Sequence, residues 1–362
     1  MVYITVLYGV IQRVLSEGIQ ETYCLPEDVF FTKAIQPVQV VRFYNDRIRR
    51  TMKNYPSIAS EQQCMSICKL ETSNDCLSIE YDYANGNCTI QATNRFKLRS
   101  RVRLMQATPG ISKTTDYYEK RPCSTNYTEE TKFVAVVPKA IDCQDLYRRG
   151  WRTNGVYAIK SYDLEGYQIP VLCQMEIAGG GWTIVQQRIP EVRVDMENSI
   201  GAYRLGFHEM LGDFWFGNEF LNNITRGNEN EVMFILTDAN GEVFYPLYEG
   251  FSVGDKSSEY VLSVGEYRYI GIGPELYDDD FKAHNGYQFS TRNRDRDGES
   301  SIRCADDIAK AGFWYGGGDC YRVNINGIAG ATNQSGIVFK EITGYGDNIT
   351  PLKKTQMLVR RV

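Results

Sequence analysis

The segment Asn293-Arg294-Asp295-Arg296-Asp297-Gly298 places an oxygen-bearing side chain at every second position and ends in glycine. Side chains spaced in this way can converge on a hard cation such as Ca²⁺ when the backbone curls, and glycine permits the sharp turn. The segment opens like an EF-hand loop, but the twelfth position is Cys304 rather than a bidentate Glu, and no flanking helices are evident. The alternative is a solvated turn whose carboxylates pair with Arg292, Arg294 and Arg296.

Side chains suited to catalysis are scarce. The 362 residues contain only two histidines, which argues against His-rich zinc sites and lowers the odds of His-based acid–base chemistry. No Gly-x-Ser-x-Gly motif occurs, and His208 has no evident Ser or Cys partner. Asp278–Asp280 is three adjacent carboxylates, a pattern typical of a solvated acidic loop. The sequence therefore predicts a protein that is not an enzyme.

The ten cysteines indicate the compartment. Their number is even and none forms a CxxC pair, so disulfide bridges are favoured over zinc sites, and disulfides place the chain outside the cytosol. Five N-glycosylation sequons agree with a secreted protein. Their acceptors are Asn87, Asn126, Asn223, Asn333 and Asn348.

Charge and hydropathy exclude further classes of function. The net charge is −5 and no long basic run occurs, so nucleic acid is not an expected partner. No stretch of 18 apolar residues is present, so no membrane-spanning segment is expected. Residues 1–15 are apolar but lack a basic start, which leaves open a truncated signal peptide, with residues 1–20 cleaved, or a first strand.

The distribution of cysteines predicts two domains. Six cysteines precede residue 125 and four follow it, separated by a polar stretch typical of a linker. We expect domains over 22–125 and 140–362, joined by a linker over 126–139. Neither a heptad repeat nor a collagen repeat occurs, so the sequence has no stalk for oligomerisation, although a homo-oligomer stays possible.

The sequence around the central cysteines of the first domain predicts a helix packed on a hairpin. Cys64 and Cys68 are four residues apart, which places both on one face of a short helix. Residues 77–83 alternate apolar and polar as a strand does, residues 84–87 form a turn, and the return strand starts at Cys88. A helix stapled to a sheet resembles the PAN/apple domain. That resemblance implies the pairs Cys24–Cys123, Cys64–Cys88 and Cys68–Cys76, whereas six cysteines alone permit 15 connectivities.

Strands dominate the second domain. We expect strands over 155–159 and 171–176, a helix over 217–225 capped by Asn218, and a hairpin over 232–245 that turns at Asn240-Gly241. The run Gly179-Gly180-Gly181 precedes a strand rather than a helix, which excludes a phosphate-binding loop.

Many short strings of this domain resemble the C-terminal globular domain of fibrinogen, which also occurs in ficolins, tachylectins, tenascins and angiopoietins. The strings are Asp142-Cys143, Gly155-Val-Tyr, Cys173-Gln-Met, Gly179-Gly-Gly-Trp-Thr, Gly212-Asp-Phe-Trp-Phe-Gly-Asn218, His284-Asn-Gly286, Phe289-Ser-Thr291, Cys304-Ala305, Phe313-Trp-Tyr315, Asn324-Ile-Asn-Gly327 and Lys354-Thr-Gln-Met357. Together the two resemblances imply an α+β protein: a disulfide-stapled PAN/apple-like domain followed by a mainly antiparallel fibrinogen-like domain.

The fibrinogen resemblance also implies bridges and sites. It implies the disulfides Cys143–Cys173 and Cys304–Cys320. It implies one Ca²⁺ held by the side chains of Asp295 and Asp297 with main-chain carbonyls near Glu299 and Ser301, although the family's earlier Asp is Asn293 in this chain. It implies a ligand pocket beside that loop, floored by the peptide after the second cysteine of the bridge, often cis, and walled by aromatic residues. The pocket residues would be Phe313, Tyr315, Cys320, Tyr321 and Asn324.

Three functions follow from these expectations. The first is a secreted lectin that binds glycans or acetylated groups through the calcium-supported pocket. The second is an adhesion or matrix protein that binds other extracellular proteins, and the third is an angiopoietin-like receptor ligand.

Overall fold

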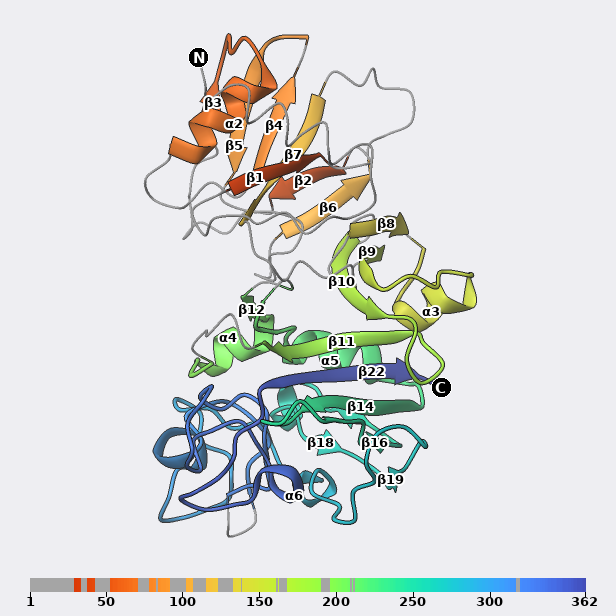
Figure 1. The fold of residues 1–362 in the computed structure, drawn as a ribbon, viewed down its shortest axis with the longest axis vertical. Coiled ribbons are helices and arrows are strands. Elements are labelled where there is room, and N and C mark those ends of the chain that lie inside the picture. Colours follow the sequence, from red (N-terminus) through yellow and green to blue (C-terminus); the bar gives the residue numbers. More distant parts are fainter. Residues whose placement is uncertain are drawn as a thin grey trace. The chain divides into compact units, whose positions relative to one another are not determined.

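The computed structural model describes residues 29–33, 38–42, 53–70, 78–82, 84–91, 102–106, 115–122, 133–137, 139–160, 162, 168–189, 196–208, 210, 212–316 and 320–362. Contacts divide the chain into two compact units (Figure 1). The predicted N-terminal segment, the Cys24–Cys123 pair and the sequon at Asn126 lie outside the described residues, as does Cys76.

The described residues of the first unit form an antiparallel sheet and one helix. Its strands are β1 (Val29–Lys33), β3 (Lys53–Tyr55), β4 (Ser78–Asp82), β5 (Asn87–Gln91) and β7 (Thr115–Pro122), and its helix is α2 (Glu61–Leu70). The strand order is β1-β7-β4-β5-β3. The predicted helix and hairpin are thus confirmed. The hairpin turns at Gly86, whose φ of +61° suits glycine.

A small core holds α2 on this sheet. Ile79 and Tyr81 alternate inward along β4 and meet the cysteines of the helix. Cys64 is bonded to Cys88 of β5, which is the predicted pair. Cys68 is also disulfide-bonded, although its partner lies outside the described residues. In a small disulfide-stapled domain of this kind, the bridges make a large contribution to stability.

One large sheet organises the second unit. Along its main path the order is β19-β16-β14-β22-β11-β10-β6-β2, and β8, β9, β12, β13 and β15 attach beside it. The long central strands are β10 (Gln168–Gln174), β11 (Trp182–Arg188), β14 (Asn230–Thr237) and β22 (Lys354–Arg361). The others are β2 (Val38–Arg42), β6 (Val102–Gln106), β8 (Phe133–Val137), β9 (Gly155–Lys160), β12 (Phe207–His208), β13 (Phe214–Trp215), β15 (Val243–Phe244), β16 (Leu247–Tyr248) and β19 (Tyr267–Arg268).

The pairing is antiparallel except between β8 and β9. The last strand, β22, lies between β11 and β14, so the C-terminal segment completes the centre of the sheet (Figure 1). The antiparallel pair of β2 and β6 is grouped with this sheet because Leu104 of β6 pairs with Gln168 of β10. The α+β class predicted from the sequence is confirmed.

The glycine run before β11 is a structural loop. All three glycines have positive φ, and a Cβ atom on Gly180 would lie 2.2 Å from the Met175 carbonyl oxygen. The side chain of Arg360 donates hydrogen bonds to the carbonyls of Ala178 and Gly180 and lies over the Trp182 ring. The carbonyls of this loop therefore face a cation, which agrees with the exclusion of a phosphate loop.

Short helices flank the sheet. They are α3 (Cys143–Arg148), α4 (Ile200–Leu205), α5 (Asn218–Thr225) and α6 (Lys340–Thr343). The prediction that Asn218 caps α5 was wrong, because Gly217 holds that position. The side chain of Asn218 is fully buried and instead accepts a hydrogen bond from the Trp215 indole. Among the described residues, no helix has the length and apolar character that a membrane span requires.

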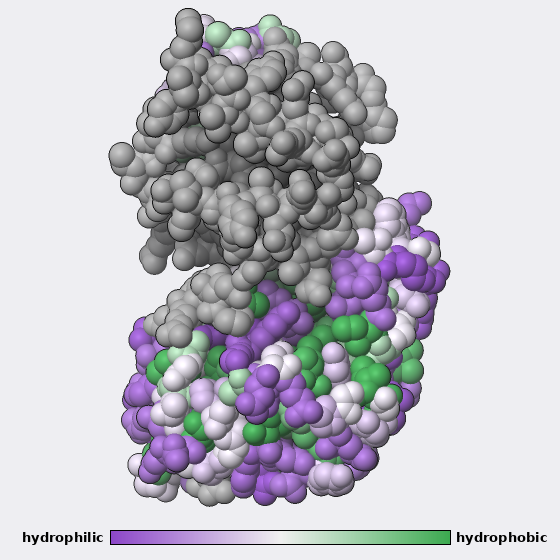
Figure 2. Space-filling model, viewed as in Figure 1, coloured by the Kyte–Doolittle hydropathy of each residue, from purple (hydrophilic) through white to green (hydrophobic). Residues whose placement is uncertain are grey.

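Beyond residue 250 the second unit is rich in loops. It contains two small sheets, β17 (Ser252–Val253) with β18 (Leu262–Ser263) and β20 (Val323–Asn324) with β21 (Val338–Phe339). Single helical turns cover Lys256–Ser258, Lys282–His284 and Cys304–Ile308. Figure 2 shows that the visible surface of this unit mixes polar and apolar residues. The predicted cation segment lies within this loop-rich region.

Candidate functional site

The segment that contains the predicted cation loop is fixed at its base. Ser290 and Phe313 exchange two backbone hydrogen bonds of 2.9 and 3.1 Å. Thr291 and Arg294 do the same within one tight turn, at 2.9 Å each. The Ser290 hydroxyl also accepts a hydrogen bond from the backbone N–H of Arg296. The backbone at the start of the loop is therefore held rigidly next to Asp295 and Asp297.

Asp297 is the buried centre of the loop. Its carboxylate accepts hydrogen bonds from the backbone N–H groups of Glu299, at 2.9 Å, and Cys304, at 2.7 Å. The side chain of Asp295 is exposed and points back, accepting a long 3.4 Å bond from the Asp297 N–H. Burial raises the pKa of Asp297, the backbone N–H groups oppose that rise, and the Asp295 charge adds to it.

The charge and geometry of this loop suit a hard cation. Neither Asp295 nor Asp297 forms an ion pair with any residue that the structure describes, so the charge of the buried Asp297 carboxylate is balanced only by its backbone N–H partners. Gly298 has a φ of +79° and open space beside it, so the chain can turn around an ion. The described residues contain no group of three or more acidic, His or Cys side chains that could hold a metal, so backbone carbonyls would have to complete the shell.

Carbonyls of Glu299 and Ser301 are the predicted oxygen donors. Ser301 is exposed and Glu299 is half-buried, so neither residue is enclosed in the core. Two carboxylates with main-chain and water oxygens form a donor set that Ca²⁺ accepts. The residues present therefore fit the ion that the sequence implied.

Asn293 anchors the loop to a helix. Its side-chain oxygen accepts hydrogen bonds from the backbone N–H of Ile200, at 2.9 Å, and from the Thr291 hydroxyl, at 3.0 Å. Ile200 is the first residue of α4. In this chain Asn293 therefore positions the loop.

A neighbouring segment holds two arginines of the loop. The carboxylate of Glu259 forms ion pairs with Arg294 and, at 3.5 Å, with Arg296. These guanidinium groups lower the pKa of Glu259. Glu259 and Tyr260 both have positive φ, of 55° and 57°, which is strained for residues with side chains. A backbone bond from Phe289 to the Glu259 carbonyl, at 3.0 Å, holds this conformation.

A disulfide ties the end of the loop to the next segment. Cys304 is bonded to Cys320, and both are buried. Cys320 has a φ of +64°, and its carbonyl accepts a hydrogen bond from the Gly316 N–H at 2.9 Å. The described residues contain no cis peptide bond, so the cis peptide expected after Cys320 is not found.

His284 joins three segments beneath this region. One ring nitrogen, Nδ1, lies 2.6 Å from the Trp314 carbonyl, while Nε2 lies 2.9 Å from the backbone N–H of Val323 and 3.2 Å from that of Arg322. The carbonyl requires a donor and the N–H groups require an acceptor, so the ring is neutral with its proton on Nδ1. Burial, together with the Arg322 charge, lowers the pKa of His284 to about 4.

Comparison with known proteins places this architecture. The sequence profile of the C-terminal globular domain of fibrinogen beta and gamma chains matches residues 139–362. The chain belongs to this family. The PAN domain profile matches residues 38–123. The fibrinogen-like domain is non-enzymatic, in agreement with the sequence prediction.

Similar proteins cover the fibrinogen-like part. Human angiopoietin-related protein 7 is 32% identical over 60% of this chain and 61% of its own length. Ryncolin-4 of Cerberus rynchops is 32% identical over 56% of this chain and 57% of its own. The chain therefore spans less than two thirds of these relatives.

Solved structures share the fold. The fibrinogen-like globe domain of human ANGPTL6 is 29% identical, with a TM-score of 0.53 over 62% of this chain and 97% of that chain. A lamprey fibrin D-dimer, complexed with the peptide ligand Gly-His-Arg-Pro-amide, is 25% identical, with a TM-score of 0.51 over 66% and 77%.

The predicted aromatic pocket of the fibrinogen-like domain lies in the core. Phe313, Tyr315 and Asn324 have no exposed surface, and Cys320 and Tyr321 are each only 2% exposed. The Tyr315 hydroxyl bonds to the Ala311 carbonyl and to the Asn324 side chain. The Tyr321 ring packs against Tyr315 and Tyr345, so it presents no open stacking surface in this structure.

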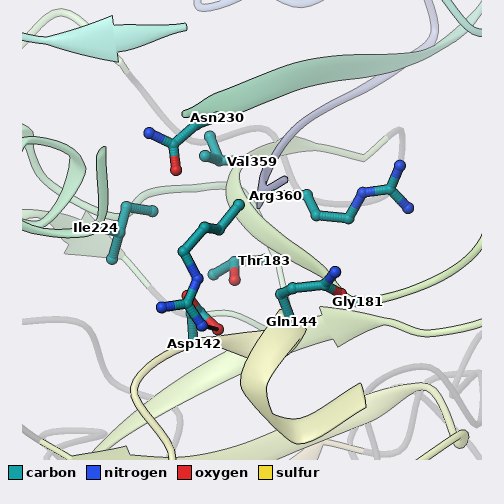
Figure 3. Close-up of a pocket in the computed structure, with 9 residues that line it drawn as sticks. Asp142, Gln144, Gly181, Thr183, Ile224, Asn230, Val359 and Arg360 are labelled. Carbon is teal, nitrogen blue, oxygen red and sulfur yellow. Dashed lines mark hydrogen bonds and ion pairs between the residues drawn. The ribbon is translucent and has the colours of Figure 1, made fainter. Parts of the chain in front are cut away.

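A small hollow elsewhere in the fibrinogen-like domain is structural (Figure 3). Asp142 caps α3 and forms an ion pair of 3.4 Å with Arg361 of β22. Burial raises the pKa of Asp142, which the hydrogen bond from the Asp145 N–H and the Arg361 charge oppose. The hollow is lined by Asp142, Gln144, Gly181, Thr183, Ile224, Asn230, Val359, Arg360 and Arg361. It lies where α3, β14 and β22 meet, and its charges are already paired.

The sequons differ in accessibility. Asn333 and Asn348 are exposed, and Asn333 forms a turn by accepting hydrogen bonds from Ser335. Asn223 lies within α5, where Thr225, the third residue of the sequon, is buried and bonded to Leu221. Asn87 is half-buried at the start of β5.

The sequence alone did not indicate the long-range contacts of Glu259 and His284. Glu259 lies 35 residues before Arg294, and nothing in its local sequence indicates that two arginines share it. His284 lies in the His-Asn-Gly string of the fibrinogen resemblance, but its partners at 314, 322 and 323 depend on tertiary folding. For Glu259, no local signal could have shown this role.

Proposed function

We propose that the fibrinogen-like domain of this chain is a recognition module of a secreted adhesion protein, and that it binds carbohydrate beside a calcium-supported loop. The observation that carries the proposal is the Asp295–Cys304 loop. It holds two carboxylates without a counter-cation among the described residues, and its far end is fixed by the Cys304–Cys320 bridge. Disulfides and sequons support an extracellular location.

In this proposal Ca²⁺ would neutralise the carboxylate pair and fix the loop. Asp297 would keep its orientation through the N–H groups of Glu299 and Cys304, while Asp295 would approach from the solvent side. The buried aromatic cluster of Phe313, Tyr315 and Tyr321 would support the loop from beneath. Contact with a sugar would then fall on the exposed loop, rather than on the rings.

The test begins with the ion. A ligand bound only by the folded state raises stability by RT ln(1 + [L]/Kd), about 2.7 kcal/mol at 100 times Kd. We expect Ca²⁺ to raise the melting midpoint of the full chain and a chelator to reverse the rise. Asp297→Asn should remove most of this shift, and Asp295→Asn should reduce it.

Asp347→Asn is the matched control, because Asp347 is exposed and lies outside the loop. It should keep the full shift. If Ca²⁺ leaves the melting midpoint of the wild type and of all three variants unchanged, the calcium site is contradicted. Binding to an array of neutral, acetylated and acidic glycans, with and without chelator, then tests the recognition role.

The second candidate is a ligand of a protein receptor, and the similarity to angiopoietin-related protein 7 favours it. The exposed surface of the fibrinogen-like domain includes Tyr277, whose side chain is 88% exposed. No binding to the glycan array, together with saturable, calcium-independent binding to protein on cell surfaces, would favour this candidate over the first.

A further inference from the structure

The calcium loop carries arginines between its acidic residues. Arg292, Arg294 and Arg296 occupy alternate positions, and Arg303 follows before the disulfide. All four lie at the surface. The side chains of Arg294, Arg296 and Arg303 are 43%, 37% and 48% exposed. The segment therefore presents guanidinium groups to solvent along its whole length.

Glu259 gathers the central pair. One carboxylate oxygen of Glu259 is the partner of both Arg294 and Arg296, so their guanidinium groups lie on the same side of the loop. The side chain of Glu259 is only 22% exposed and its backbone is held at positive φ. A strained, half-buried residue that aligns two exposed arginines is a device for positioning them.

Most of the donors of this pair stay available. A guanidinium group carries five N–H donors in a fixed fork. Apart from Glu259, the only acceptor that the described residues give the pair is the Asp295 carbonyl, 3.3 Å from Arg296. One carboxylate oxygen cannot saturate two forks. The remaining donors therefore face solvent in a fixed arrangement.

A second pair of arginines lies next to the first. The guanidinium group of Arg303 reaches back to donate to the Arg292 carbonyl and forms an ion pair of 2.8 Å with Asp306. Arg303 thus lies beside the start of the loop, close to Arg292. We name the group of Arg292, Arg294, Arg296 and Arg303 the arginine surface.

We propose that the arginine surface binds the sulfate groups of an acidic glycan. Guanidinium forks match the oxygens of a sulfate better than they match neutral sugar hydroxyls. The bridges and sequons place the chain where sulfated glycans, rather than nucleic acids, are the available polyanions. The proposal rests on the proposed recognition function and names its ligand chemistry.

The charge balance predicts how calcium takes part. Residues 292–303 contain four arginines against three acidic residues, Asp295, Asp297 and Glu299. Glu259 and Asp306 offset two of the arginines, so the surface is nearly neutral without a cation. A bound Ca²⁺ adds two positive charges. The whole chain has a net charge of −5, so attraction must be local.

The experiment compares dextran sulfate with unmodified dextran, which shares its backbone, and with hyaluronan, an acidic polymer of a different backbone. The full chain is passed over immobilised dextran sulfate, unmodified dextran and hyaluronan, which carries carboxylates but no sulfate. We expect binding to dextran sulfate that exceeds binding to both other polymers. Arg294→Gln with Arg296→Gln should weaken it roughly tenfold, because two exposed charge-assisted contacts are lost.

Arg149→Gln is the matched control. Arg149 is 43% exposed, like Arg294, and is likewise paired with one carboxylate, but it lies in the turn after α3. The Arg149→Gln variant should bind dextran sulfate as tightly as the wild type. Arg294→Lys with Arg296→Lys keeps the charge without the fork and should lose part of the affinity. Arg303→Gln tests the second pair if the first double variant does not fold.

The outcomes separate this inference from the proposed function. Wild-type affinity in both the Arg294/Arg296 double Gln variant and Arg303→Gln, or equal binding to dextran, overturns the arginine surface. Equal binding to hyaluronan overturns the assignment to sulfate. If Ca²⁺ leaves the melting midpoint unchanged but the Gln variants lose dextran sulfate, the calcium site fails and the arginine surface stands. If Ca²⁺ raises the melting midpoint but the Gln variants bind dextran sulfate like the wild type, the calcium site stands and the arginine surface fails.

Discussion

Replacing His284 tests whether one buried, neutral ring stabilises the fibrinogen-like domain. The ring is 1% exposed and bridges the Trp314 carbonyl and the Val323 N–H. His284→Gln removes the titrating ring and breaks at least part of this bridge. Since a buried group left unpaired costs about 1–3 kcal/mol, we expect a loss of roughly 2–4 kcal/mol of unfolding free energy at pH 7.5.

The pH dependence is the sharper part of this prediction. Burial lowers the pKa of His284 from 6.5 to about 4 in the folded domain. Below pH 6.5 the unfolded chain therefore takes up a proton that the folded domain does not. The stability contributed by His284 is complete above pH 7 and falls as the pH drops toward 4. The loss is about 2 kcal/mol at pH 5 and about 3 kcal/mol below pH 4.

Asp280 acts in the opposite direction. Its carboxylate is fully buried, accepts a hydrogen bond from the Glu341 N–H and lies 3.6 Å from Arg322. Burial raises its pKa from 3.8 to about 6, so the folded domain binds this proton more tightly and gains stability as the pH falls below 6. The pH profile of the wild type alone therefore mixes two opposed effects. The difference between wild type and His284→Gln cancels Asp280.

The assay is urea unfolding of the full chain at pH 7.5 and pH 5, with disulfides intact. All four tryptophans, Trp151, Trp182, Trp215 and Trp314, lie in the fibrinogen-like domain, so their fluorescence reports that domain. We expect the stability gap between wild type and variant to narrow by about 2 kcal/mol from pH 7.5 to pH 5. An equal gap at both pH values would show that the folded ring titrates normally, and would refute the neutral, locked ring.

Two further predictions concern the loops of the same domain. Gly180→Ala should cost more than about 3 kcal/mol in the same assay, because its Cβ would lie 2.2 Å from the Met175 oxygen. Gly227→Ala, which has the same φ of +72° but open space, should cost only about 1 kcal/mol, and equal losses would contradict the steric argument. In protein secreted by eukaryotic cells, peptide mapping should find glycans on the exposed Asn333 and Asn348. Asn333→Gln should remove one glycan mass, whereas a glycan on Asn223 alone would contradict the role given to burial.

Local features of the sequence determined much of this architecture. The i, i+4 cysteines predicted the helix that Cys64 staples to β5, since helical neighbours lie on one face. The glycine run before Trp182 predicted a tight loop rather than a phosphate site, because the run leads into a strand. The alternation of oxygen side chains from Asn293 to Asp297 marked the loop that the structure builds. In each case the signal lies within a few residues.

Tertiary structure alone decided the rest. Tyr321 follows a cysteine beside a surface loop, and nothing nearby shows that its ring packs on Tyr345. Arg360 binds the glycine loop 180 residues before it because the sheet pairs β22 with β11. Glu259 pairs with Arg294 because a backbone hydrogen bond from Phe289 joins their two segments. Burial and pairing depend on which distant segments become neighbours. The sequence therefore specified the oxygen atoms and arginines of the loop, while the fold decided which of them face solvent.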